Sequence, residues 1–299
     1  YMPCFTDDEV ASAHARLAMQ QSLGLATEWV DPDDVDRRNP ILAPGKTLGA
    51  SYFAGDGYID PPRNVAAYAA ALASSGVQVW ERTTFTGLLT GGDRVTGVRT
   101  SRGDVMCGAV VLTGGPTLAA VGAAAGAARI WSAGTRHQVV VTGPHPDLTH
   151  ANVPMVFDVM SGIYWRPEDG GLLWGMSNPD EQPGEATGFD DAYFALMRAR
   201  MAELVPVTAD LGLRRTWAAT IDYTPDHLPI IGAMLRPDGA PVDGAWVAAA
   251  GGHGMMWGPG VSRSVADLVL TGETDVVDAA PLGMDRFDDH GRSNLETDP

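Results

Sequence analysis

Cysteine is scarce in this chain, with only Cys4 and Cys107 among its 299 residues. Two cysteines are too few for the disulfide framework that stabilises small secreted proteins, so we expect a cytoplasmic, reducing environment. No group of His, Cys and Glu has the spacing of a zinc site, and no Gly-x-Ser-x-Gly turn of a serine hydrolase occurs. We therefore expect neither a metal in the site nor a nucleophilic triad.

Basic residues and long apolar runs are also few. The chain has 20 Lys and Arg against 37 Asp and Glu, for a formal net charge of -17. This balance argues against nucleic acid and anionic membranes as partners. No apolar run is long enough to span a bilayer. At this length, with 45% hydrophobic residues, we expect an ordinary globular protein with one large core or two domains.

Helical and strand patterns alternate along the chain, which indicates an α/β (α+β) fold. A loop is expected at 234–244. Helices are expected at 7–23, 31–38, 60–75, 190–204 and about 259–270, and strands at 49–54, 77–79, 84–90, 94–100, 109–112, 137–142, 155–158, 162–166 and 171–175.

A glycine-rich turn follows an apolar strand near the C-terminus. Gly251, Gly252 and Gly254 permit positive φ and leave room for a ligand close to the backbone. The helix expected at 259–270 would point its positive end at this turn, which suits a flat or anionic cofactor. From these residues alone, a tight turn without any ligand is equally consistent.

Three motifs occur in a particular order in the last third of the chain. They are Thr-Pro-Asp-x-x-Pro-Ile-Ile-Gly at 224–232, Gly-His-Gly at 252–254 and Arg286-Phe287. With these motifs the chain resembles the C-terminal part of the D-amino-acid oxidase family of flavoproteins, which includes glycine oxidase, sarcosine oxidase and dimethylglycine dehydrogenase. The resemblance implies FAD as cofactor and hydride transfer to the flavin from a small amine or amino acid.

The resemblance also implies two interleaved domains, an FAD/NAD(P)-binding Rossmann-like domain and an antiparallel-sheet substrate domain. The family's Gly-x-Gly-x-x-Gly unit, which holds the FAD pyrophosphate, is not found here, and the chain opens at Tyr1. We therefore expect an N-terminally incomplete flavoprotein, in a homo- or hetero-oligomer. The alternative is a non-catalytic chain that binds a partner and holds no flavin. The expected segments are 1–54 (substrate domain and connection), 55–132 (FAD-binding), 133–216 (substrate domain) and 217–299 (FAD-binding).

Several residues are implied to lie beside FAD. For the Gly114-Gly115 pair the alternative is a plain turn, and for the two methionines it is core packing. Met256 stands where monomeric sarcosine oxidases have a lysine that assists the reaction with oxygen, so a dehydrogenase is as consistent as an oxidase. The implied FAD-binding residues are Gly114, Gly115, Pro225, Asp226, Gly251, Gly252, His253, Gly254, Met255 and Met256.

His253, in the Gly-His-Gly turn, is expected from the resemblance to lie beside the flavin ring and the substrate; the alternative is a histidine that caps the turn through backbone hydrogen bonds. The segment Tyr164-Trp165-Arg166-Pro167 resembles a Tyr-x-Arg-Pro segment of the family's substrate domain. Arg166 would bind a substrate carboxylate through two parallel hydrogen bonds, or it would form a surface ion pair with Glu168 or Asp169.

Asp222 lies near the position where glycine oxidases carry a carboxylate-binding arginine. An acidic side chain there would suit a substrate with a second cationic group, and the alternative is a turn or salt-bridge residue. Trp165, Trp174 and Trp217 would wall an amine pocket through cation–π contacts, or would be ordinary core.

Overall fold

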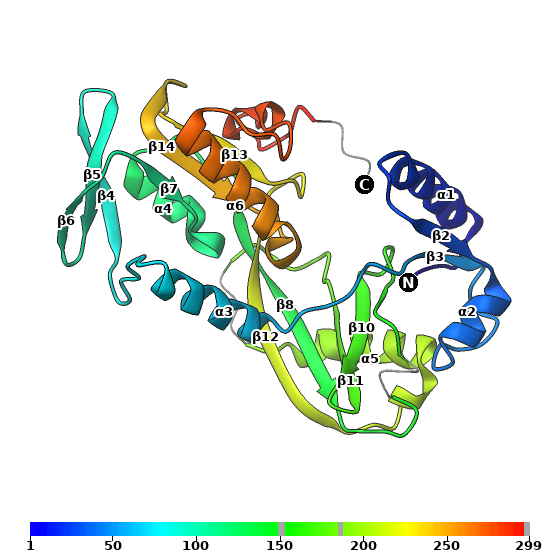
Figure 1. Ribbon diagram of the computed structural model, residues 1–299. Coiled ribbons are helices and arrows are strands. Elements are labelled where there is room, and N and C mark those ends of the chain that lie inside the picture. The colour runs from blue at the N-terminus through cyan, green and yellow to red at the C-terminus, as the bar shows by residue number, and fades with distance from the viewer. Residues whose placement is uncertain (149–152, 185–187, 296–299) are drawn as a thin grey trace. The chain divides into compact units, whose positions relative to one another are not determined.

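The computed structural model describes residues 1–148, 153–184 and 188–295, which form a mixed α/β fold (Figure 1). The chain divides into two compact units that are interleaved in sequence. Unit 1 contains Tyr1–Asp60, His137–Glu181 and Ala186–Ala219, and unit 2 contains Pro61–Arg136, Gln182–Glu185 and Thr220–Pro299. That segments 1–54 and 133–216 bind the substrate, and that segments 55–132 and 217–299 bind FAD, stays a prediction.

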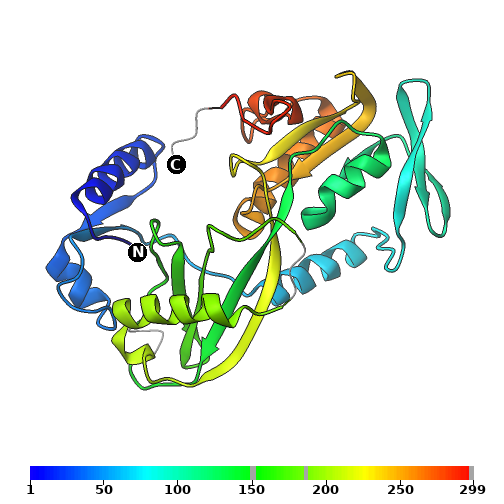
Figure 2. The same ribbon diagram turned by 180° about the vertical axis from the view of Figure 1, so that it is seen from behind.

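The main sheet of unit 1 has the strand order β12-β8-β11-β10-β9. Helix α5 (Asp191–Leu204) covers one face of it, as Figure 2 shows from behind. The Asp190 side chain caps this helix by accepting hydrogen bonds from the N–H groups of Ala192 and Tyr193. The strands are β8 (Ala133–Thr142), β9 (Val156–Phe157), β10 (Ile163–Glu168), β11 (Gly171–Met176) and β12 (Leu213–Tyr223).

Successive side chains of a strand point to opposite faces of the sheet, so every second side chain of these strands lies in the core beneath α5. Trp165 and Trp174 belong to that set, and they are 0% and 1% exposed and pack with Met197 and Met201. Of the two alternatives for these tryptophans, the amine-pocket wall is excluded and the ordinary-core alternative holds. They are core residues, because their strand positions face the helix rather than solvent.

A second, three-stranded sheet in unit 1 has the order β1-β3-β2. Thr6 caps the first helix by accepting a hydrogen bond from the Glu9 N–H, and Pro32 opens the second. Both helices lie where the sequence predicts them. The elements are β1 (Met2–Cys4), α1 (Asp7–Ser22), β2 (Thr27–Val30), α2 (Pro32–Arg38) and β3 (Gly49–Phe53).

Unit 2 is built on a six-stranded sheet in which β13, β14, β5 and β4 follow one another, while β6 pairs with β5 and β7 runs parallel to β14. Helix α6 packs on this sheet through Val261 and Val265 against Ile231 and Ala248 (Figure 1). The elements are α3 (Pro61–Ser74), β4 (Phe85–Gly91), β5 (Arg94–Thr100), β6 (Gly103–Met106), β7 (Val110–Leu112), α4 (Leu118–Ala125), β13 (Ile230–Leu235), β14 (Pro241–Ala249) and α6 (Gly254–Thr271).

Two sequence predictions in unit 2 are wrong. The strand expected at 77–79 is absent, and Val77 and Val79 are 49% and 62% exposed, because no described strand pairs with this segment. The loop expected at 234–244 is mostly strand, since β13 and β14 form a hairpin. The turn between them spans only 236–240, where the Arg236 N–H donates to the Ala240 carbonyl at 2.8 Å.

The last helix begins earlier than its proline suggests. We expected it to start at Pro259, since proline favours the first helical position. Instead α6 begins at Gly254 and contains Pro259 in its interior, where the proline forgoes a hydrogen bond to the Met255 carbonyl. The N-terminus of α6 consequently lies directly at the glycine-rich turn.

Candidate functional site

The turn between β14 and α6 needs its glycines for both conformation and space. Gly251 and Gly252 have φ of 62° and 103°. A Cβ on Gly251 would lie 2.6 Å from the Leu228 carbonyl oxygen, and one on Gly252 would lie 2.3 Å from Cε1 of Tyr223. A Cβ on Gly254 would meet nothing within 4 Å, so the space beside the first residue of α6 is open.

His253 is the N-terminal flanking residue of α6. Its ring lies 4.4 Å from that of Trp257, and its Nδ1 is buried without a hydrogen-bond partner among the described residues. Burial and, secondly, the nearby His227 lower the pKa of His253, so its ring is neutral at pH 7. A neutral imidazole with one unpartnered nitrogen can accept or donate one hydrogen bond to a ligand.

The two methionines that follow are not core residues. Met255 and Met256 are 39% and 69% exposed, which excludes the core-packing alternative. Two exposed thioether side chains at a glycine-rich turn offer an apolar surface suited to a flat ring.

Asp226 is held by a buried ion pair. The Arg286 Nε donates to one of its carboxylate oxygens at 2.7 Å and the Arg286 Nη2 to the other at 3.0 Å, and both side chains are almost fully buried. Burial acts to raise the pKa of Asp226, but hydrogen bonds from Arg286, Ser293 and the Leu228 N–H, together with the charge of Arg286, outweigh it and lower the pKa to about 2. Arg286 also donates to the Leu228 carbonyl at 3.0 Å, so the pair fixes the turn at 224–228.

Gly114 and Gly115 follow strand β7. A Cβ on Gly114 would lie 2.9 Å from the Leu118 Cα, and Gly115 has φ of 53°. The Thr117 hydroxyl closes the turn by donating to the Gly114 carbonyl at 2.8 Å. Local geometry thus requires both glycines, and their contact with a cofactor stays a prediction.

Asp222 lies near the end of β12, is half-buried, and forms no ion pair with a described residue. Burial raises the pKa of its carboxyl. The salt-bridge alternative is therefore not realised among the described residues.

The face of the unit 1 sheet opposite α5 carries Tyr164 and His137. The His137 Nε2 and the Tyr164 hydroxyl are 3.0 Å apart, and the two rings stack with centroids separated by 5.7 Å. Tyr164 is opposite Gly175 in the register, where a Cβ would lie 2.6 Å from the Tyr164 hydroxyl oxygen. Glycine at this position therefore makes room for the phenol.

His137 was not singled out from the sequence as a site residue. It is 9% exposed, and burial lowers its pKa to about 4. The sequence pattern that could have indicated His137 is the alternation of strand side chains, which puts His137 on the same face as Val139 and Val141. These valines belong to an apolar cluster against which Tyr164 and Trp217 pack. A neutral histidine hydrogen-bonded to a tyrosine on an apolar face can fix the direction in which the phenol hydroxyl meets a ligand.

Arg166 lies two residues beyond Tyr164 on β10, on the same face. Its Nη1 donates to the Glu168 carboxylate, and its guanidinium lies 4.8 Å over the Tyr58 ring. Glu168 also lies 3.7 Å from Nη2 of Arg215. Arg166 therefore forms the ion pair with Glu168 that was its alternative role. Because Arg166 and Arg215 share the single Glu168 carboxylate, the three side chains together carry a net positive charge.

Residues 1–268 match the model of a protein family described as FAD dependent oxidoreductase. The chain belongs to this family. The match to the family agrees with the resemblance inferred from the three C-terminal motifs. FAD is the cofactor that the family implies, and the open helix start, the unpartnered His253 nitrogen and the exposed methionines of the turn fit such a group.

Among curated proteins, the chain is 29% identical to 4-methylaminobutanoate oxidase (formaldehyde-forming) of Paenarthrobacter nicotinovorans, over 89% of this chain and 33% of that protein. It is 27% identical to mouse mitochondrial dimethylglycine dehydrogenase over 84% of this chain and 31% of that protein. It is 29% identical to sarcosine oxidase subunit beta of Rhodobacter capsulatus over 87% of this chain and 61% of that protein. The chain thus spans about a third of the length of the first two relatives.

Solved structures of the same fold include L-proline dehydrogenase from P. horikoshii, with a TM-score of 0.87 and 25% identity over 96% of this chain and 75% of that one. Glycine oxidase from Geobacillus kaustophilus has a TM-score of 0.80 and 24% identity over 95% of this chain and 73% of that one.

None of the helices in the described part of the chain could cross a membrane, and those residues contain no cluster of three or more potential metal ligands.

Proposed function

We propose that this chain is part of an enzyme that uses FAD to oxidise the C–N bond of a small N-methylated amino acid. The observation that carries the proposal is the His137–Tyr164 pair, 3.0 Å apart on an apolar sheet face, with Arg166 two residues along the strand. The names of the relatives support it, because 4-methylaminobutanoate, dimethylglycine and sarcosine are all N-methylated amino acids.

When bound, FAD accepts a hydride from the carbon beside the substrate nitrogen, and the resulting imine hydrolyses to a carbonyl compound and a smaller amine. In our proposal, the substrate binds as its neutral amine, and the Tyr164 hydroxyl, held by its hydrogen bond to neutral His137, contacts the amine so that the nitrogen lone pair stays free. Arg166 and Arg215 together attract the substrate carboxylate. In unit 2, His253, Met255 and Met256 contact the flavin.

Asp226 acts on the cofactor indirectly in this proposal. Its carboxylate oxygens are occupied by Arg286, so it positions the turn that precedes β13 rather than touching FAD. The relatives named as subunits support assembly with a further chain. A cytoplasmic location is proposed on the low cysteine content alone.

The test is a product assay on the protein purified from its complete gene. We expect formaldehyde from sarcosine, dimethylglycine and 4-methylaminobutanoate, and much slower release from dimethylamine, which has no carboxylate. Equal rates with dimethylamine would contradict the role of the arginines. A protein that purifies without flavin and releases no carbonyl product from any of these compounds would show instead that the chain is a non-catalytic partner-binding one.

A further inference from the structure

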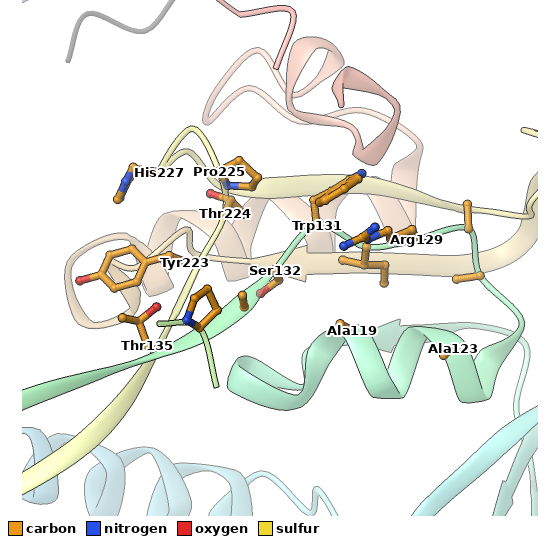
Figure 3. Close-up of a pocket in the computed structure, with 15 residues that line it drawn as sticks. Ala119, Ala123, Arg129, Trp131, Ser132, Thr135, Tyr223, Thr224, Pro225 and His227 are labelled. Atoms are coloured by element: carbon orange, nitrogen blue, oxygen red, sulfur yellow. The ribbon is translucent and has the colours of Figure 1, made fainter. Parts of the chain in front are cut away.

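Unit 2 contains a hollow of about 640 Å³ that the proposed function does not use (Figure 3). Its floor is one face of helix α4, with Ala119 and Ala123, and its walls come from segment 129–135 and the turn at 223–227. Figure 3 shows Arg129 and Trp131 beside one another above α4, with Tyr223 and His227 at the other end of the view.

The charge of this hollow differs from that of the rest of the chain. None of its fifteen described lining residues is Asp or Glu, whereas the whole chain has 37 acidic residues and a net charge of -17. Arg129 and His227 are its basic groups. The acidic neighbour in this turn, Asp226, is neutralised by Arg286 inside the protein. The local field therefore favours an anion.

Arg129 is held ready for a ligand. Its guanidinium carbon lies 3.6 Å from the centroid of the Trp131 ring, and no described carboxylate pairs with it. The Trp131 ring is in turn fixed by close approach of the chain at Gly291, where a Cβ would lie 2.7 Å from Cε3 of the indole. A guanidinium already fixed by stacking loses less conformational freedom when it binds an anion.

A second polar group in the wall lacks a partner. The hydroxyl of Ser132 is buried and makes no hydrogen bond to any described residue. Leaving a buried hydroxyl unsatisfied is unfavourable, and a ligand oxygen in the hollow would satisfy it.

We propose that this hollow binds an organic anion with a flat apolar body. The anionic group would receive hydrogen bonds from Arg129 and Ser132. The apolar body would lie on the alanine face of α4 and against Pro225. Apart from Pro225, which the family resemblance implies to lie beside FAD, this site consists of residues other than those proposed for the flavin and the amine.

The test uses 2-naphthoate and its neutral counterpart 2-naphthamide as probes, with equilibrium dialysis against the protein purified from its complete gene. We expect wild type to bind 2-naphthoate roughly ten-fold more tightly than 2-naphthamide. Arg129→Leu should weaken 2-naphthoate binding by a similar factor and leave 2-naphthamide nearly unchanged. Ala123→Trp, at an exposed helix position, should fill the hollow and displace both probes.

Arg102→Leu is the matched control, because Arg102 is exposed in unit 2 and does not line the hollow. It should leave the affinity for both probes unchanged. If the Arg129 and Ala123 variants bind 2-naphthoate as tightly as wild type, the probe binds elsewhere and the proposal is wrong. Failure of wild type to bind 2-naphthoate would also overturn it. Thermal unfolding of each variant shows whether a loss of binding is a loss of fold.

Discussion

The hydrogen bond between His137 and Tyr164 is the residue-scale feature on which the proposed chemistry depends. We expect Tyr164→Phe and His137→Gln each to slow flavin reduction by about 10²-fold, because each change removes a group that positions the substrate amine. Because the two residues act as one unit, the double variant should be little slower than either single one. Rapid-mixing kinetics would measure this, and simply multiplicative losses would show that the residues act separately.

The buried His137 also predicts how stability depends on pH. Its pKa is about 4 in the folded protein, below the ordinary value of 6.5, so the unfolded chain binds more protons between these values. Its contribution to stability is therefore complete above pH 6.5 and is lost as the pH falls towards 4, by at most about 1.4 kcal/mol per pH unit. Urea unfolding at several pH values would show a shallower decline in His137→Gln. An identical slope in both proteins would contradict the burial of a neutral histidine.

Sequence reasoning reached Tyr164 and Arg166 through a short motif, but it did not reach His137. The pairing of His137 with Tyr164 depends on the register of three strands, which brings residues 27 positions apart to one face. A histidine within a strand carries no local sign of its partner. Long-range register is therefore the physical information that the sequence did not supply.

At the scale of elements, the Asp226–Arg286 pair joins the turn before β13 to the C-terminal segment. Asp226→Asn would leave the Arg286 charge buried without its partner, and we expect a loss of about 3–5 kcal/mol in unfolding free energy. The control is Asp243→Asn, which breaks an ion pair with Arg94 whose side chains are more than half exposed. That variant should lose no more than about 1 kcal/mol. Equal losses in the two variants would contradict the structural role of the buried pair.

The glycine-rich turn allows a second matched comparison. Gly252 and Gly239 both have positive φ, but only at Gly252 would a Cβ overlap another residue, Tyr223. Gly239→Ala should cost about 1–2 kcal/mol from backbone strain alone. Gly252→Ala should cost more and should also weaken FAD retention, measured by the absorbance of the purified protein. If Gly252→Ala retained as much FAD as Gly239→Ala does, the turn would not contact the flavin.

Helices and strands were predictable from the sequence where residues at their own ends fix where they begin. Helices α1, α2 and α5 have side-chain caps or an initial proline, and the sequence predicted all three. The segment 77–79 looked like a strand from its valines, but a strand forms only where another strand pairs with it. Pro259 likewise marked a plausible helix start, and packing of α6 on the sheet extended the helix past it.

At the scale of the whole molecule, the family follows from three motifs in order, and the match over residues 1–268 confirms it. The chain passes back and forth between two units. For this reason, local sequence patterns predicted helices and strands better than they predicted which residues share a site. Each unit is assembled from segments distant in sequence. The lining of the Arg129 hollow, for example, comes from segments around residues 119, 129 and 223.

The measurement that tests the central claim most directly is an anaerobic titration of the protein purified from its complete gene. Sarcosine, dimethylglycine and 4-methylaminobutanoate would be added in turn while the visible absorption spectrum is recorded. Our account predicts a flavin spectrum that bleaches with at least one of these compounds and bleaches far more slowly in Tyr164→Phe. A flavin spectrum unchanged by all three compounds, or a protein that remains colourless with added FAD, would contradict it.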